Sequence, residues 1–291
     1  MPHDNVLGLI AGNGRFPFLV LEAARARGEE VVVAAITEET EPEIAERAAG
    51  DSGIRLHWLS LGELSKLIET FQREGVSRAI MAGQVKHKQI FSSIRPDWRL
   101  AKLLLSISTR NTDALLGAIT KVLADEGITL LSSTSYLEPL LARAGVLTKR
   151  APTPEEQKNV QYGREVARHL AQYDIGQTVV IAEAACLAVE AMEGTDAAIV
   201  RAGEIMRSMR PTEPPAVAGG AFFSRALTVV KVAKPKQDQR FDVPVVGVKT
   251  IAIMREAGAS CLAVDAGRCL FLDGERVIAA ADEGGVAITA D

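Results

Sequence analysis

Residues 6–36 read VLGLIAGNGRFPFLVLEAARARGEEVVVAAI, and this stretch decides the fold class of the first half of the chain. A short apolar run leads into a glycine-rich turn, a helix-forming stretch follows from about Phe16, and VVVAAI forms a second apolar run. The same alternation continues through RLHWL, GELSKLIETFQREG and RAIMAG, as far as about residue 83. Strands that alternate with helices are typical of a parallel sheet covered by helices. The pattern therefore predicts a Rossmann-like domain.

A polar stretch with two prolines, LTKRAPTPEEQ at residues 147–157, separates the two halves. Such a composition is typical of a connection between structured segments. We therefore predict a Rossmann-like N-terminal domain over residues 1–148 and a C-terminal α/β domain over residues 149–291. The second half mixes short apolar runs, such as LTVVKVA and CLAVDAG, with helical stretches. Its fold class is predicted to be mixed α/β.

The composition disfavours some classes of protein. The 291 residues carry a formal net charge of -4, with 24% charged and 4% aromatic residues, so the chain lacks the basic field that attracts nucleic acid. Cys186, Cys261 and Cys269 lie in apolar runs without the close pairing of a zinc site or a disulfide framework. The start MPHDNVLGLI is unlike a signal peptide, and no apolar run approaches the ~20 residues of a membrane span. We expect a cytoplasmic protein that binds no nucleic acid.

Two glycine-containing turns are predicted at the carboxyl edge of the first sheet, where ligands of open α/β sheets bind. Gly12, Asn13 and Gly14 join the first strand to the first helix, while Gly83 and Gln84 follow the fourth strand. Backbone N–H groups at the start of a helix favour a phosphate, so a nucleotide is a candidate ligand. A tight turn without a ligand explains the glycines of the first turn equally well.

A nicotinamide dinucleotide is one candidate for that nucleotide. Glu38 follows the second strand, near the position of the acid that binds ribose in dinucleotide-binding folds. Pro17, however, stands where the dinucleotide fingerprint has its third glycine. The second half also supplies no obvious site for hydride transfer. An NAD(P)-dependent oxidoreductase is therefore an alternative to the function favoured below.

A basic amphipathic stretch follows the fourth strand. Between Lys86 and Leu105, cationic residues are interleaved with isoleucine, phenylalanine, tryptophan and leucine. This pattern suits an acidic, lipid-like ligand or an anionic membrane surface. It also suits an ordinary helix that packs one face on a core, which the pattern alone favours. A non-enzymatic, lipid-binding peripheral protein is thus a second alternative.

Two further motifs have both a functional and a structural interpretation. Thr112 and Asp113 have the residue types of a capped helix start. Glu190, Glu193 and Asp196 place three carboxylates within seven residues, a spacing that can gather oxygen ligands for Mg²⁺. A capped helix start beside two solvated glutamates explains the same three residues without a metal.

The densest polar segment is KPKQDQRFDVPVVG at residues 234–247, which follows an apolar strand. Cations such as Lys234 and Arg240 can neutralise phosphate oxygens, while a carboxylate such as Asp242 activates water or binds a metal. Gln237 adds a hydrogen-bonding side chain. A solvated connection of similar composition would look the same in sequence.

In their order along the chain, these motifs resemble the LpxI family, the UDP-2,3-diacylglucosamine pyrophosphatases of lipid A biosynthesis. The matching stretches are LGLIAGNGRFP, IMAGQV, the DALL of NTDALL, DIGQTVVIAE, AVEAMEGTDA, and KPKQDQRFDVPVVG with the later DAGR. The resemblance implies that the substrate lies in a cleft between the N-terminal domain and a catalytic C-terminal domain, with its acyl chains in an apolar cavity. It also implies metal-dependent hydrolysis of UDP-2,3-diacylglucosamine to UMP and 2,3-diacylglucosamine 1-phosphate (lipid X), with attack at the β-phosphorus favoured.

The resemblance and the residue types together predict roles for individual residues. Asp242, in the R-x-D-x-P pattern, matches the family's critical aspartate. The predicted catalytic residues are Asp242, Arg240 and Lys234. The predicted ligands of Mg²⁺, or of another divalent cation, are Asp242, Glu190, Glu193 and Asp196. The predicted substrate-binding residues are Gly12, Asn13, Gly14, Gly83, Gln84, Thr112, Asp113, Gln177 and Gln237. The expected partners are the amphipathic substrate, the inner face of the inner membrane as a peripheral contact, and a second copy of the chain in a homodimer.

Overall fold

The computed structural model describes residues 5–85, 95–107, 112–209, 227–235 and 238–291, and of residues 112 and 113 only the backbone. The chain folds into two compact units. The first unit comprises Met1–Leu137 together with Asp238–Asp242, and the second comprises Glu138–Gln237 together with Val243–Asp291. A short segment from the second half of the sequence therefore belongs to the first unit.

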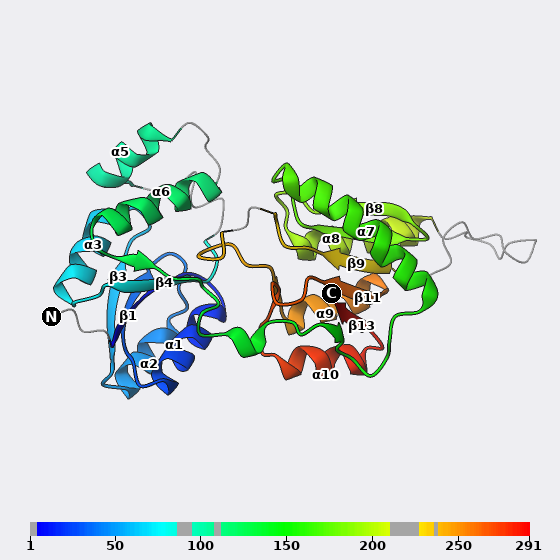
Figure 1. The fold of residues 1–291 in the computed structure, drawn as a ribbon, viewed down its shortest axis with the longest axis horizontal. Coiled ribbons are helices and arrows are strands. Elements are labelled where there is room, and N and C mark those ends of the chain that lie inside the picture. Colours follow the sequence, from blue (N-terminus) through cyan, green and yellow to red (C-terminus); the bar gives the residue numbers. More distant parts are fainter. Residues whose placement is uncertain (1–4, 86–94, 108–111, 210–226, 236–237) are drawn as a thin grey trace, which may run out of the picture. The chain divides into compact units, whose positions relative to one another are not determined.

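A five-stranded parallel sheet forms the centre of the first unit (Figure 1). Its strands lie in the order β3-β2-β1-β4-β5. They are β1 (Val6–Ala11), β2 (Glu30–Ile36), β3 (Ile54–Leu59), β4 (Arg78–Ala82) and β5 (Thr129–Leu130). β1 and β2 are buried along almost their whole length, because helices cover both faces of the sheet. The predicted parallel sheet is confirmed.

The helices of this unit lie with α1 and α2 on one face of the sheet and α3, α5 and α6 on the other (Figure 1). They are α1 (Phe16–Ala26), α2 (Glu43–Gly50), α3 (Leu64–Arg73), α5 (Trp98–Ser106) and α6 (Thr112–Asp125). α3 buries Leu64, Leu67, Ile68 and Phe71, which have the i, i+3, i+4, i+7 spacing of a helix with one apolar face. These side chains pack with strand residues such as Val32 in one core cluster.

A six-stranded mixed sheet forms the centre of the second unit, in the order β6-β13-β11-β9-β7-β8. Its strands are β6 (Gly145–Val146), β7 (Thr178–Ala182), β8 (Ala185–Val189), β9 (Leu227–Lys231), β11 (Ala259–Val264) and β13 (Ala287–Ala290). β9, β11 and β13 are parallel to one another, and β6, β7 and β8 are antiparallel to their neighbours. β10 (Val245–Val246) and β12 (Leu270–Phe271) form a separate parallel pair. The predicted mixed α/β fold of this half is confirmed.

Helices cover this sheet as well. They are α7 (Pro154–Gln172), α8 (Thr195–Ser208), α9 (Val248–Ala257) and α10 (Glu275–Glu283), and the 3-10 turn η1 (Glu138–Leu140) precedes them. Val160 and Ala167 of α7 pack with strand residues in one core cluster. Ile199 of α8, Ile251 of α9 and Val277 of α10 belong to another. Among the described residues, every helix is too short or too polar to cross a membrane.

The polar stretch at residues 147–157 contains the start of α7. The side-chain oxygen of Thr153 accepts a hydrogen bond from the backbone N–H of Glu156 at 3.2 Å, and the Glu156 carboxylate accepts one from the backbone N–H of Thr153 at 2.8 Å. This reciprocal pair is a capping box, which satisfies two N–H groups that a helix start otherwise leaves without partners. The chain passes from the first unit to the second before this point, between Leu137 and Glu138.

Candidate functional site

The two glycine-containing turns of the first unit are paired with each other at the carboxyl edge of the sheet. The backbone N–H of Gly12 donates to the carbonyl of Ala82 at 2.8 Å, and Asn13 and Gln84 exchange two N–H···O bonds of 2.8 and 3.1 Å. A Cβ at Gly12 would lie 2.8 Å from the Gln84 carbonyl oxygen, and one at Gly83 would lie 2.7 Å from that of Asn13. These glycines are therefore required because two backbones approach closely.

The start of α1 remains open beside this pair of turns. Gly14 has a positive φ of 88°, and within the described residues a Cβ there would meet no atom within 4 Å. Across the same described range, no side chain caps the first turn of α1, and Pro17 occupies a position that a helix start tolerates. Pro17 has no N–H, and the backbone N–H groups of Phe18 and Leu19 donate to the Arg15 carbonyl at 3.1 and 3.3 Å, so it is the positive end of the helix dipole that suits a phosphate at this helix start. Of the glycine-turn residues predicted to bind substrate, Gly14 is thus the best placed for an anion.

Glu38 has a structural partner in the first unit. Its Oε2 accepts a hydrogen bond from the backbone N–H of Leu61 at 3.1 Å, and so links the loop after β2 to the loop after β3. A ribose-binding acid needs its carboxylate for the sugar hydroxyls. The geometry therefore favours the interpretation of Glu38 as a loop-fixing residue over its use by a dinucleotide.

Asp242 ends a tight turn that Asp238 organises. The Asp238 carbonyl accepts hydrogen bonds from the backbone N–H groups of Phe241 at 3.2 Å and Asp242 at 2.9 Å. The Asp238 carboxylate accepts hydrogen bonds from Arg240, from its backbone N at 3.1 Å, its Nε at 2.8 Å and its Nη2 at 2.5 Å. The hydrogen bonds from the Arg240 side chain lower the pKa of Asp238, so the pair is ionic at neutral pH. Arg240 is thereby held in one orientation.

The same turn is attached to the chain that follows β5. The Gln239 carbonyl accepts hydrogen bonds from the backbone N and Oγ of Ser133, both at 2.9 Å, and from Oγ of Ser132 at 3.3 Å. Phe241 packs against the core cluster of α3, α5 and α6. Asp242 is half-buried, with its Oδ2 shielded from solvent. Three neighbouring strands, β1, β4 and β5, thus bring the glycine turns and the Asp242 turn to one edge of the sheet.

Ser132 and Ser133 were not predicted as site residues. The one signal in the sequence is their position, because two polar residues directly follow the apolar run ITLL, where the carboxyl end of a strand was expected. Of the remaining predicted site residues in the first unit, Thr112 and Asp113 lie at the start of α6, and their side chains are outside the described residues. Gln237 is also outside the described residues.

Glu190, in the second unit, belongs to a buried polar network. Its Oε1 accepts a hydrogen bond from Oγ1 of Thr195 at 2.8 Å, and its Oε2 accepts one from the backbone N–H of Gln177 at 3.2 Å. Nζ of Lys231 donates to the same Thr195 oxygen at 2.7 Å. Glu190 is 8% exposed and Lys231 is 6% exposed, so Thr195 links two buried side chains of opposite charge. In this network the Thr195 hydroxyl connects Glu190 to Lys231.

The other two carboxylates of the acidic motif have different partners. Glu193 accepts hydrogen bonds from Arg201 at 2.6 Å and from the backbone N–H of Ala191 at 3.1 Å. Asp196 accepts one from Oγ1 of Thr250 at 3.1 Å and lies 3.4 Å from Nζ of Lys249. Within the described residues, no three carboxylate, histidine or cysteine side chains are grouped so as to hold a metal ion.

Lys234 lies in the second unit, whereas Arg240 and Asp242 belong to the first. Its Nζ forms an ion pair with Asp174 at 2.6 Å, and its carbonyl accepts a hydrogen bond from Arg268 at 3.2 Å. Both predicted catalytic cations, Lys234 and Arg240, are therefore paired with an aspartate.

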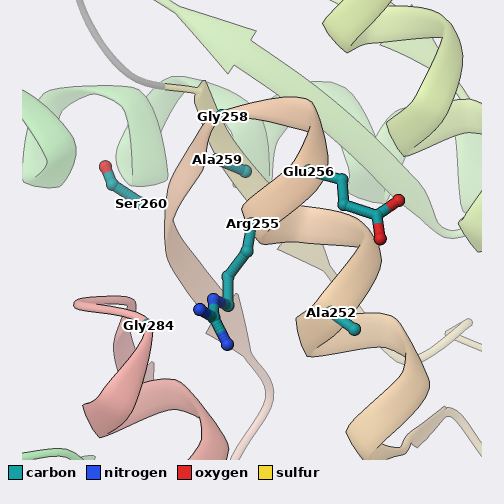
Figure 2. A pocket seen from close by; sticks show the side chains of 7 residues that line it. All are labelled: Ala252, Arg255, Glu256, Gly258, Ala259, Ser260 and Gly284. Atoms are coloured by element: carbon teal, nitrogen blue, oxygen red, sulfur yellow. The ribbon is translucent and has the colours of Figure 1, made fainter.

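A shallow hollow in the second unit lies at the opposite edge of the mixed sheet from Lys231. It is formed where α9 and α10 end and β11 begins, and Figure 2 shows Arg255 reaching toward Gly284 across it. The carboxyl ends of helices carry the negative end of the helix dipole and disfavour phosphate. This hollow contains none of the predicted site residues.

The fold and the candidate site together define a two-domain α/β protein. One edge of its first sheet carries a helix start that suits an anion and the turn that ends at Asp242. Two family models match the chain, the LpxI N-terminal domain over residues 6–140 and the LpxI C-terminal domain over residues 143–289. A relative from Caulobacter vibrioides, UDP-2,3-diacylglucosamine pyrophosphatase LpxI, is 34% identical over 283 residues, which cover 96% of this chain and 95% of that protein. The chain belongs to the LpxI family, as its motifs predicted.

Proposed function

We propose that this chain hydrolyses the pyrophosphate bond of UDP-2,3-diacylglucosamine and releases UMP and 2,3-diacylglucosamine 1-phosphate. The observation that carries the proposal is the similarity, along nearly the whole chain, to a pyrophosphatase named for that substrate. The geometry of the first unit supports it, because Asp242 and the open start of α1 belong to the same edge of one sheet. In the reaction, a water oxygen forms a new bond to phosphorus as the bridging P–O bond breaks.

The described residues support a division of roles. Asp242 accepts the proton of the attacking water or helps to hold a metal ion. The positive end of the α1 dipole, beside Gly14, attracts a phosphate oxygen. Arg240 offsets the charge that develops on the diphosphate, and its pairing with Asp238 orients the guanidinium before substrate binds. Lys234, the other predicted catalytic cation, belongs to the second unit and is paired there with Asp174.

Dependence on Mg²⁺ is part of the proposal. Mg²⁺ is usually bound by one or two carboxylates together with water and substrate phosphates. Asp242 fits such a role as a single carboxylate. Glu190, Glu193 and Asp196 do not fit as a joint set of ligands, because each carboxylate is directed to its own partners. When bound, the ion would neutralise phosphate charge and polarise the phosphorus centre.

Removal of divalent cations with EDTA, followed by gel filtration, is expected to abolish hydrolysis, and addition of Mg²⁺ is expected to restore it. The physical reason is that the diphosphate charge would then be offset by side chains alone. The measurement is UMP release with and without added Mg²⁺. Undiminished turnover of the metal-free protein would remove the metal from the proposed reaction.

The direct test of the reaction uses purified protein, UDP-2,3-diacylglucosamine and heavy-oxygen water. Mass analysis should find UMP and 2,3-diacylglucosamine 1-phosphate. Attack at the β-phosphorus, which we favour, places the heavy oxygen in the lipid phosphate, whereas attack at the α-phosphorus places it in UMP. Absence of both products would refute the proposed function.

We also propose a peripheral contact with the inner face of the inner membrane, through α5. Trp98, Lys102 and Leu105 share the i, i+4, i+7 spacing of one helical face. Trp98 is 67% exposed and Leu105 is 86% exposed, and Lys102 between them is also exposed. An aromatic, a basic and an aliphatic side chain on one face suit the boundary between lipid head groups and acyl chains.

Replacement of both Trp98 and Leu105 by serine is expected to weaken binding to phosphatidylglycerol vesicles by about tenfold, because the apolar part of the contact is lost. Co-sedimentation measures the bound fraction. The matched control replaces Met192, an 82% exposed residue of the second unit, by serine. Equal binding by the two variants would argue against α5 as the contact.

A homodimer remains a prediction, which light scattering of the protein in solution can check.

A further inference from the structure

The turn at Asp238–Asp242 depends on one side chain for its shape. The Asp238 carbonyl accepts the N–H groups of both Phe241 and Asp242, which is one turn of helical hydrogen bonding and fixes the direction in which the Asp242 side chain leaves the backbone. The Asp238 carboxylate adds the backbone N–H of Arg240 and two guanidinium N–H groups. Asp238 therefore closes the turn and orients Arg240 at the same time.

The turn also contacts the rest of the first unit at two points. Ser133 is 1% exposed and directs both its backbone N–H and its hydroxyl at the Gln239 carbonyl. On the other side of Arg240, Phe241 packs against the core cluster that contains Leu115 of α6. Asp242 follows Phe241 directly in sequence. Its backbone is thus fixed by contacts that need not involve a substrate.

We propose that Asp238, Ser133 and Phe241 are positioning residues for Asp242, which hold its carboxylate at the reacting phosphate without touching the substrate. The inference rests on the proposed function of Asp242. Displacement of a reacting group by ~1 Å costs on the order of 100-fold in rate. Loosening the turn should therefore lower kcat strongly and leave KM almost unchanged.

The first test compares Asp238→Asn with Asp51→Asn, because the two aspartates have closely similar surroundings. Asp51 also forms a two-bond pair with an arginine, Arg25, at 2.8 and 2.9 Å, and it also accepts the N–H of the residue two positions later, Gly53, at 2.9 Å. Asp51 precedes β3, however, and so lies at the amino edge of the same sheet. The two substitutions remove the same charge and weaken the same kinds of bond.

We expect Asp238→Asn to lower kcat by roughly 30- to 100-fold with KM within about twofold of wild type, and Asp51→Asn to leave both within about twofold. Both variants should show the same circular dichroism spectrum as wild type. Equal losses of kcat in the two variants would overturn the positioning role of Asp238, since a general loss of stability would affect them alike.

The second test does not depend on activity. Trypsin can cut after Arg240 only when the turn separates from its contacts on the first unit. We therefore expect this cut, identified by mass, to be about tenfold faster in Ser133→Ala and Phe241→Ala than in wild type. Phe241→Leu keeps part of the apolar contact and should lie between them and wild type, which covers the case that Phe241→Ala does not fold. An unchanged rate of cleavage in Ser133→Ala and Phe241→Leu would contradict the proposal that these two residues hold the turn in place.

The two tests also separate this inference from the proposed function. If Asp242→Ala keeps full turnover, the proposed role of Asp242 and its positioning both fail. If Asp242→Ala abolishes turnover while Asp238→Asn and Phe241→Leu retain the kcat of wild type, the positioning role alone fails. The inference is supported when loss of kcat and faster cleavage after Arg240 occur together in Phe241→Leu.

Discussion

Asp242→Ala is expected to lower kcat by about 1000-fold or more while the protein keeps its fold and still binds substrate. A carboxylate that acts as a general base contributes about 10²- to 10⁴-fold to the rate, and one that also holds a metal ion contributes through the ion as well. The fold should persist, because the turn uses the backbone N–H of Asp242, which alanine retains. UMP release at saturating substrate measures the effect.

The control for this substitution is Asp51→Ala, which removes an ion-paired aspartate from the amino edge of the same sheet. It should keep the turnover of wild type. Asp242→Asn preserves the shape of the side chain and removes its charge, so it should be nearly as inactive as Asp242→Ala if charge is what the reaction needs. Near-normal hydrolysis by Asp242→Ala would withdraw the catalytic assignment.

Most of the fold of the first unit could be predicted because its signals are local. The stretch at residues 6–36 forms β1, α1 and β2 in the predicted order, with Pro17 in the first turn of α1. Short apolar runs and helical periodicity specify such elements within a few residues of chain. The sequence also predicted that the two glycine turns meet at one edge of the sheet, because parallel strands present their carboxyl ends on the same side.

The position of Asp242 could not be predicted in this way. Its turn lies in the first unit through contacts such as that between Ser133 and Gln239, which are 106 residues apart in sequence. Composition shows that residues 234–247 are polar and constrained by prolines, and gives no information about which sheet they contact. The family resemblance predicts a role for this residue, and the structure shows the contacts that hold its turn on the first unit.

The acidic motif shows that close spacing along the chain does not predict where side chains point. Glu190 follows the end of β8, Glu193 precedes Gly194 with its positive φ of 83°, and Asp196 lies in the first turn of α8. Because the backbone changes direction twice over these residues, their side chains point to different partners. Proximity in sequence indicated a shared ligand, whereas the directions of the side chains depend on the strand end, the turn and the helix start.

Glu190→Ala is expected to destabilise the second unit strongly. Removal of the carboxylate takes away the acceptor of both the Thr195 hydroxyl and the Gln177 N–H and interrupts the hydrogen-bond chain to buried Lys231, and the loss of a hydrogen bond to a charged group costs about 1.5–3 kcal/mol. For a unit of this size the melting temperature should fall by roughly 10 °C. Thermal unfolding in the absence of metal measures the change.

Glu193→Ala is the matched control, because this residue belongs to the same motif and its ion pair with Arg201 is solvent-exposed. Exposed pairs contribute about 0–1 kcal/mol, so its melting temperature should remain close to that of wild type. Replacement of both buried partners, Glu190→Gln with Lys231→Met, should recover much of the loss, because no unpaired charge is then left inside the protein. If Glu190 acted chiefly as a metal ligand, Glu190→Ala would instead change the Mg²⁺ dependence of turnover and leave the metal-free melting temperature unaltered. We expect loss of stability, because buried Lys231 is connected to the Glu190 carboxylate through the Thr195 hydroxyl.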